Sequence, residues 1–113
     1  MRAVNKNSGK VLAADLLIAD TPFARMKGLL GRDALRDGEG LLLRPCKGVH
    51  TFFMKFPIDV LFLDKDNRIL ETVHNLKPQR ATTIWLRSRG AIELPAGTVL
   101  ASGSEVGDQI VVA

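Results

Sequence analysis

The sequence lacks several features that would narrow its function at once. It has one cysteine, no tyrosine and one tryptophan among 113 residues. A single cysteine cannot form an internal disulfide, so nothing calls for an oxidising compartment. No apolar run approaches the ~18 residues of a membrane span. The first twenty residues are interrupted by Asp15 and Asp20 and contain no unbroken signal-peptide core. We therefore expect a cytoplasmic protein without a membrane span.

The composition is that of an ordinary soluble globular protein, with 46% hydrophobic and 25% charged residues. A chain of this length has room for one hydrophobic core, so residues 1–113 are expected to form a single domain. The net charge of +4 raises nucleic acid as a partner. The basic residues are scattered along the sequence, however, without a basic helix or a ribonucleoprotein-type aromatic pattern. We assign them to a solvated surface and do not expect nucleic-acid binding.

One short helix is predicted after residue 20. Thr21 suits the N-cap and Pro22 suits the first helical position. Gly28 would then lie inside the helix, and Gly31 would end it. Phe23, Met26 and Leu30 would fall on one face of this helix.

The rest of the chain is divided by frequent turn residues into short apolar segments. The clearest hairpin joins residues 58–63 to 68–73. In residues 51–56 the alternation would place Phe52, Met54 and Phe56 on one face of a strand. The other expected strands and short apolar runs are 2–5, 10–18, 41–43, 82–86, 91–94, 98–101 and 109–112. About eight short strands and one helix predict a mainly β fold, a single-domain sandwich or barrel.

The segment CKGVHTFFMKFPID, residues 46–59, is the most informative part of the chain. It contains the only cysteine, one of two histidines, a methionine, three of five phenylalanines and an acid. A polar loop that runs directly into an aromatic segment would place any chemistry at the edge of the core. The segment is therefore a candidate site, although it completes no catalytic or cofactor signature.

Metal binding is one alternative for this segment. Thiolate and imidazole are good ligands for zinc or copper, and the spacing Cys46-x3-His50 lets both reach one ion. Met54 could add a soft third ligand, but the set falls short of the four ligands of a structural zinc site. We prefer a buried thiol, a hydrogen-bonded loop histidine and a core methionine, with no cofactor.

A nucleophilic cysteine is a second alternative. His50, with Lys47 and Arg44, could lower the pKa of Cys46 and favour the thiolate. No orienting Asn or Asp can be assigned, and no second cysteine is available for redox exchange. A lone cysteine in a β domain is more often a small buried hydrophobic residue.

Two acids lie in apolar settings, where a carboxylate generally needs a partner. They are Asp59 and Glu93, and the obvious partners are Arg25 and Arg32. Bidentate arginine pairs would fasten the helix to the sheet. A ligand-binding cluster and an acid/base pair are the alternatives, because a spacing of 34 residues does not establish whether the two acids meet.

Four motifs occur in an order that resembles the Domain of Unknown Function 192 (DUF192) family. They are RMKGLLGR at 25–32, FMKFPIDV at 53–60, ELPAG at 93–97 and Gly107-Asp108. The resemblance runs from about residue 10 to the end, and it implies a compact all-β domain of jelly-roll-like type, found in bacteria and archaea. The recurrent polar positions of the family fall here on Arg25, Arg32, Asp59, Glu93 and Asp108. The family itself is uncharacterised, so the resemblance implies no activity.

These observations predict a small binding or accessory module rather than an enzyme. The expected ligand is a polar or anionic small molecule or a peptide, held against the aromatic segment. The residues expected to bind it are Arg25, Arg32, His50, Asp59 and Glu93. A metal- or cysteine-dependent enzyme that uses Cys46 and His50 is the main alternative, and a weak nucleic-acid binder is another.

Overall fold

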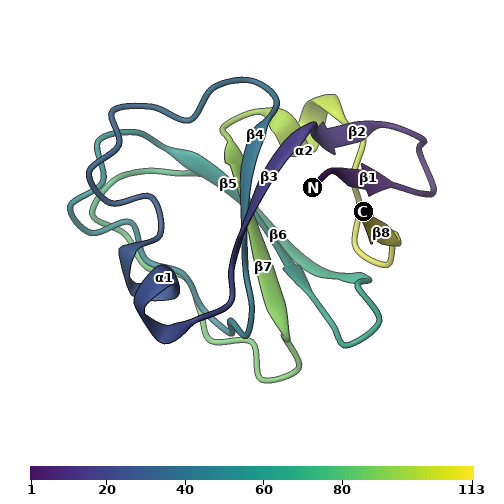
Figure 1. Cartoon of the computed structure of the whole chain (residues 1–113). Helices are drawn as coiled ribbons and strands as arrows, with labels where there is room; N and C mark the ends of the chain where they lie inside the picture. The colour runs from purple at the N-terminus through teal and green to yellow at the C-terminus, as the bar shows by residue number, and fades with distance from the viewer.

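The computed structural model describes residues 1–113 and contains two β-sheets and two short helices (Figure 1). The helices are α1 (Pro22–Lys27) and α2 (Thr98–Ala101). The strands are β1 (Ala3–Asn5), β2 (Val11–Ala13), β3 (Asp15–Ala19), β4 (Glu39–Leu43), β5 (Ile58–Leu63), β6 (Ile69–Leu76), β7 (Gly90–Pro95) and β8 (Ile110–Val112).

The two sheets confirm the expected mainly β fold. The larger sheet has the order β3-β4-β7-β5-β6, in which β3 and β4 are parallel and the other neighbours are antiparallel. The smaller sheet has the order β2-β1-β8 and lies to one side of the larger one (Figure 1). Both termini lie at the smaller sheet, where the N–H of Arg2 donates to the carbonyl oxygen of Ala113 at 2.7 Å.

The larger sheet has a hydrophobic core on each face, because successive side chains of a strand point to opposite faces. On β4, Leu42 belongs to the core shared with the smaller sheet, whereas Leu41 and Leu43 belong to the second core. On β7, Ile92 belongs to the core shared with the smaller sheet, and Ala91 belongs to the second core. Burial on both faces explains why β4, β5 and β7 are mainly apolar, with Asp59 and Glu93 as the acids within β5 and β7.

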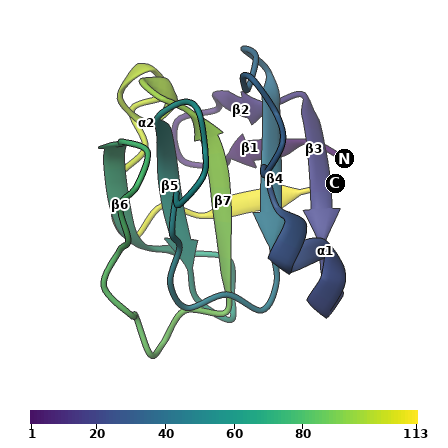
Figure 2. The ribbon, with the colours of Figure 1, turned by 90° about the vertical axis from the view of Figure 1, so that its left-hand side faces the viewer.

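Three long connections cover the second face of the larger sheet, as Figure 2 shows. They are residues 20–38, which include α1, and residues 44–57 and 77–89. The last two run side by side in opposite directions. Backbone N–H groups of Thr51, Thr82 and Trp85 donate across them to the carbonyl oxygens of Arg80, Val49 and Lys47, each at 2.8 Å. These connections are therefore ordered without forming strands.

Several local predictions are confirmed and others are wrong. The hairpin of residues 58–63 and 68–73 forms as expected. The strand expected at 2–5 is β1, and the strand expected at 10–18 is divided into β2 and β3. The Thr21 hydroxyl caps α1 by accepting from the N–H of Ala24 at 3.1 Å. The predicted strands at 51–56 and 82–86 are loops, because their backbone groups bond to one another and to side chains instead of to the sheet. Residues 98–101 form α2 rather than a strand.

The apolar side chains of the first helix are not buried. Phe23 and Met26 are 71% and 70% exposed, and α1 buries none of its own residues. Gly28 does not lie inside the helix but ends it, with φ of 47°, a conformation that glycine adopts more readily than other residues. The chain then turns inward, and Leu29 rather than the helix enters the core.

Candidate functional site

A cavity of about 600 Å³ opens between α1, the start of the 44–57 connection and the larger sheet. This size is within the usual range for small-molecule sites. Most of its wall is apolar, and its polar side chains are few. The apolar lining consists of Pro22, Met26, Leu29, Leu30, Leu43, Pro45, Val49 and Met54, and the polar or charged side chains are Arg25, Lys27, Cys46, Lys47, His50 and Glu93.

Glu93 is the only acid that lines the cavity. It lies on β7 opposite Leu41 of β4 and Val60 of β5, so its side chain shares their face of the sheet. The residue is 4% exposed, and its carboxyl group forms no hydrogen bond within the protein. Burial raises the pKa of Glu93 to about 8. The group is therefore mainly protonated and neutral at pH near 7.

Arg25 and Lys27 supply positive charge beside this neutral acid. The Nη1 of Arg25 donates to the carbonyl oxygen of Pro45 at 3.4 Å, and its Nε is buried without a partner. No acidic side chain forms an ion pair with Arg25 or Lys27. Lys47 also lines the cavity, but its ammonium group donates to the carbonyl oxygen of Leu86. The buried cationic donor without a partner at the cavity is thus the Nε of Arg25, on α1.

Cys46 lines the cavity, and its surroundings favour the neutral thiol over the nucleophilic thiolate. Its Sγ donates to the carbonyl oxygen of Gly48 at 3.1 Å. Burial raises the pKa of Cys46, and the nearby Glu93 raises it further, whereas the Gly48 hydrogen bond and Arg25 lower it by less. His50 forms no hydrogen bond to Cys46 and stacks instead on Phe52, with ring centroids 5.4 Å apart. The pair does not have the geometry of a cysteine–histidine catalytic site.

Metal ligands do not gather in this region. No group of three or more His, Cys, Asp or Glu side chains is placed to hold an ion. His50 is solvent-exposed, and Met54 is largely buried in the second core. Cys46 and His50 therefore offer two donors of an incomplete set, and the preference for a protein without zinc or copper stays a prediction.

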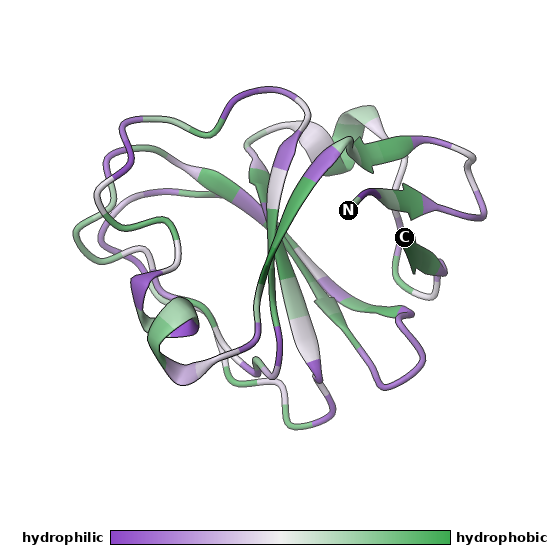
Figure 3. Ribbon diagram, in the orientation of Figure 1, coloured by the Kyte–Doolittle hydropathy of each residue, from purple (hydrophilic) through white to green (hydrophobic).

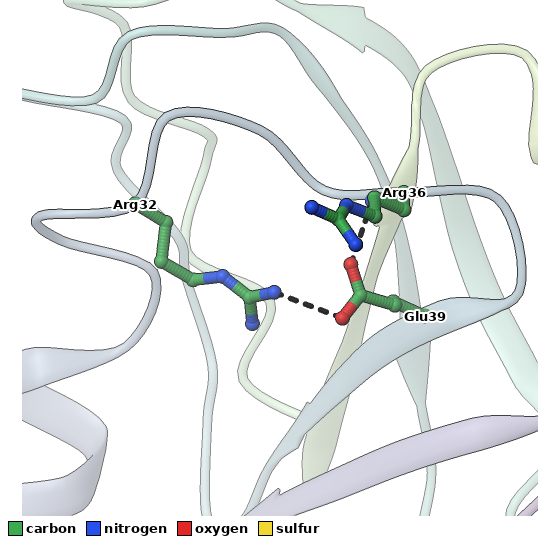
Figure 4. Close-up of polar contacts among 3 residues, drawn as sticks. All are labelled: Arg32, Arg36 and Glu39. Carbon is green, nitrogen blue, oxygen red and sulfur yellow. Dashed lines mark hydrogen bonds and ion pairs between the residues drawn. The ribbon is translucent and has the colours of Figure 1, made fainter.

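Arg32 does not reach either of its expected partners. Its Nη2 lies 3.0 Å from the Oε2 of Glu39, at the start of β4 (Figure 4). The other oxygen of Glu39 accepts the N–H of Arg36 at 2.8 Å. These hydrogen bonds, that of Arg36 first, lower the pKa of Glu39. The prediction that Arg32 pairs with a buried acid is wrong. Arg32 instead pairs with Glu39, which lies seven residues along the chain at the first position of β4.

The side chain of Asp59 lies on the opposite face of the larger sheet from the cavity, where backbone N–H groups donate hydrogen bonds to it. The residue is fully buried, and its Oδ2 accepts the N–H groups of Gly97 and Val99 at 3.0 and 2.9 Å. Its Oδ1 accepts the N–H of Asn75 at 2.8 Å. These three bonds satisfy the carboxylate and fasten the turn before α2 to β5. The predicted pairing of Asp59 with an arginine is wrong, and this acid does not line the cavity.

The structure therefore brings together three of the five residues predicted to bind a ligand. Arg25, His50 and Glu93 line the cavity, and Cys46 lies with them, whereas Arg32 and Asp59 lie elsewhere. Lys27 and the apolar wall were not predicted from the sequence. The signal for both was the segment MKGLL at 26–30, in which a glycine that ends the helix directs the next two leucines toward the cavity.

Comparisons with known proteins agree with this architecture. A UPF0127 protein of the archaeon Pyrococcus horikoshii is 36% identical over 110 residues, which are 95% of this chain and 95% of the relative. A UPF0127 protein of Thermococcus sibiricus is 33% identical over 95% of this chain and 71% of its own length. The curated relatives named here are archaeal, so a specifically bacterial assignment is not supported.

A solved structure shares the fold. The crystal structure of a protein of unknown function from Novosphingobium aromaticivorans matches 99% of this chain and 84% of its own, with a TM-score of 0.87 and 22% identity. The family model of DUF192, described as "Uncharacterized ACR", matches residues 3–112. The family resemblance is thus confirmed over nearly the whole chain, and the protein belongs to the DUF192 family.

Proposed function

We propose that the chain is a binding module whose cavity takes a small ligand with an apolar body and an anionic group. The observation that carries this proposal is the make-up of the cavity: an apolar wall, two cations of α1 without acidic partners, and a single acid that is buried and neutral at pH near 7. An apolar pocket with a small number of polar groups is the usual form of a small-molecule site.

The apolar wall would provide most of the binding free energy. Transfer of apolar surface from water contributes roughly 25 cal/mol per Å². Leu29, Leu43 and Val49 are largely buried and fixed in the second core, so this part of the wall is formed before a ligand arrives. Met26 and Met54 have flexible side chains that can adapt to ligands of different shape.

Arg25 and Lys27 would favour a ligand of negative charge. Arg25 and Lys27 lie two positions apart on α1, and Arg25 retains a buried Nε–H without a partner. A carboxylate, sulfonate or phosphate near this position would accept a charge-assisted hydrogen bond from that group. A cationic ligand would meet the same two charges and be disfavoured.

Glu93 would act as a neutral hydrogen-bonding group at the inner end of the site. A protonated carboxyl can donate one hydrogen bond and accept others, which a carboxylate cannot do. A neutral acid also avoids repelling an anion, whereas an ionised Glu93 would oppose it. Acid/base catalysis by paired carboxylates has no geometric support here, because Asp59 does not line the cavity.

Three eight-carbon probes that differ mainly in their charged group would test this proposal: octanoate, octanol and octylammonium. Amide shifts of Gly28 and Gly48 in NMR titrations would report binding at the cavity. Octanoate should bind more tightly than octanol, and octylammonium should bind most weakly. The Arg25→Gln/Lys27→Gln variant should remove the preference for octanoate, whereas the exposed matched control Lys6→Gln/Lys10→Gln should keep it. A cavity that prefers octylammonium, or binds no probe, would refute the proposal.

A further inference from the structure

The three connections that cover the second face of the sheet differ in charge from the rest of the chain. Residues 20–38, 44–57 and 77–89 contain 11 of the 16 Lys and Arg residues and 3 of the 12 Asp and Glu residues. They therefore carry a formal charge of +8, and the remainder of the chain carries −4. The basic residues that look scattered in the sequence are gathered by the fold.

Two of these connections are basic throughout. Residues 44–57 and 77–89 contain seven Lys and Arg residues and no acid. All seven are exposed, and backbone hydrogen bonds hold the two connections side by side. Arg44 and Arg89 lie at the ends of the connections, beside Asp64 of the turn between β5 and β6. A concentration of one charge on one face is the electrostatic footprint of an anionic partner.

The same face exposes large apolar side chains. Five such side chains in the protein are at least 70% exposed, and four of them lie on these connections. They are Phe23, Met26, Phe53 and Leu86. Figure 3 shows hydrophobic stretches interleaved with hydrophilic ones along these connections. Scattered exposed apolar residues are ordinary, but their concentration beside basic residues on one face marks an interaction surface.

Phe53 is held in this exposed position by its backbone. Its φ is 66°, a left-handed conformation that is unfavourable for a bulky residue, and its side chain is 81% exposed. The N–H of Phe53 donates to the side chain of Gln79 on the neighbouring connection. The loop thus holds the aromatic ring of Phe53 in solvent, although the ring contributes little to the core.

We infer that this face binds the surface of an anionic lipid bilayer. Basic side chains attract anionic headgroups, and protruding aromatic and aliphatic side chains enter the boundary between the headgroups and the acyl chains. A peptide partner would be better served by apolar side chains that line a groove, whereas Phe53 and Leu86 protrude and line no part of the cavity. Met26 and Lys47 belong to both this face and the cavity lining, but the inference does not rest on the proposed ligand, because it requires nothing to be bound in the cavity.

Co-sedimentation with lipid vesicles would test the inference. One set of vesicles would consist of phosphatidylcholine, and the other of equal parts of phosphatidylcholine and phosphatidylglycerol. The wild-type protein should bind the second set only, and high salt should weaken binding. The Arg80→Gln/Arg87→Gln variant should lower the partition coefficient about fivefold for each cation removed. The Phe53→Ser/Leu86→Ser variant should lower it on the order of tenfold.

Matched controls separate this face from the rest of the protein. Leu100 on α2 is 79% exposed but lies at the other side of the larger sheet, so Leu100→Ser should bind vesicles as the wild type does. Phe53→Ser/Leu86→Ser should keep its affinity for octanoate, since neither residue lines the cavity.

Two results would overturn the inference. One is failure to bind anionic vesicles, and polyglutamate binding that is lost in Arg80→Gln/Arg87→Gln would then identify an acidic polypeptide as the partner. The other is vesicle binding that is unchanged in the variants of this face or is lost equally in Leu100→Ser.

Discussion

Asp59 and Glu93 lie on neighbouring strands and on opposite faces of the same sheet. Glu93 of β7 is paired with Val60 of β5, and Asp59 is paired with Leu94, so one step along both strands separates the two acids. Side chains of directly opposed residues share a face, and successive side chains alternate. Asp59 therefore joins the core that contains Leu94, where three N–H groups satisfy it, and Glu93 enters the ligand-sized cavity.

The buried acid should make stability depend on pH. Burial raises the pKa of Glu93 from 4.5 to about 8 in the folded protein. Between these values the folded state holds a proton that the unfolded state has released, so stability falls as pH rises through this window, by about 1.4 kcal/mol per pH unit. Urea denaturation across this range should show the fall, and Glu93→Gln should remove it. Glu105→Gln, an exposed control, should leave the fall in place.

The acid on the opposite face should be structural. Asp59→Asn replaces one of the two acceptor oxygens by a donor and leaves at least one buried N–H without a partner. We expect the free energy of unfolding to fall by about 2–4 kcal/mol, because a hydrogen bond to a charged group is worth about 1.5–3 kcal/mol. Urea denaturation of this variant, with the exposed control Asp66→Asn, would measure the change. Octanoate affinity that falls in folded Asp59→Asn would contradict the assignment of the two acids to separate faces.

Phe53 should not be required for folding. Glycine adopts a φ of 66° without the steric cost that phenylalanine incurs, and the exposed ring gains little from burial in the folded state. Phe53→Gly should therefore leave the free energy of unfolding unchanged or raise it by up to about 1 kcal/mol. Relief of backbone strain stabilises the folded state, whereas the greater flexibility of glycine in the unfolded chain offsets part of this gain. Phe62→Ala is the matched comparison, because Phe62 is fully buried and its loss should cost about 3–5 kcal/mol. A large loss of stability in Phe53→Gly would show that the ring packs against the fold.

The only cysteine should behave as a structural thiol. Burial raises the pKa of Cys46 and so opposes the thiolate that alkylation and metal binding both need. We expect slow reaction with iodoacetamide at pH near 7, and mass spectrometry of tag-free protein should find less than stoichiometric zinc and copper. Cys46→Ser should leave both the fold and octanoate binding in place. Stoichiometric metal that is lost in both Cys46→Ser and His50→Ala would restore the metal alternative.

Elements that are determined by residues close to one another in the sequence could be predicted. The hairpin of β5 and β6 has apolar runs separated by a turn, and the α1 cap is local to Thr21 and Pro22. The prediction of a strand at 51–56 was wrong, since the alternation of Phe52, Met54 and Phe56 mimics a strand. Thr51 instead bonds to Lys77 and Arg80, about thirty residues away, and these contacts leave no local pattern.

The candidate site could be predicted only in part. Arg25, His50 and Glu93 were identified by their residue type, but the face on which an acid lies depends on strand register. A shift of one residue in the pairing of β5 and β7 would place Asp59 directly opposite Glu93, on the same face of the sheet. The basic face could not be predicted for a similar reason, because it gathers residues from three separate connections.

The most direct test of the proposed ligand site is the pH dependence of octanoate affinity in the wild type and in Glu93→Gln, measured by NMR titration. In the wild type, affinity should fall as pH rises through about 8, because ionised Glu93 would then repel the anion. In Glu93→Gln the affinity should stay constant over the same range. An affinity that varies with pH in the same way in both proteins, or amide shifts that lie away from the cavity, would contradict the assignment of Glu93 to the binding site.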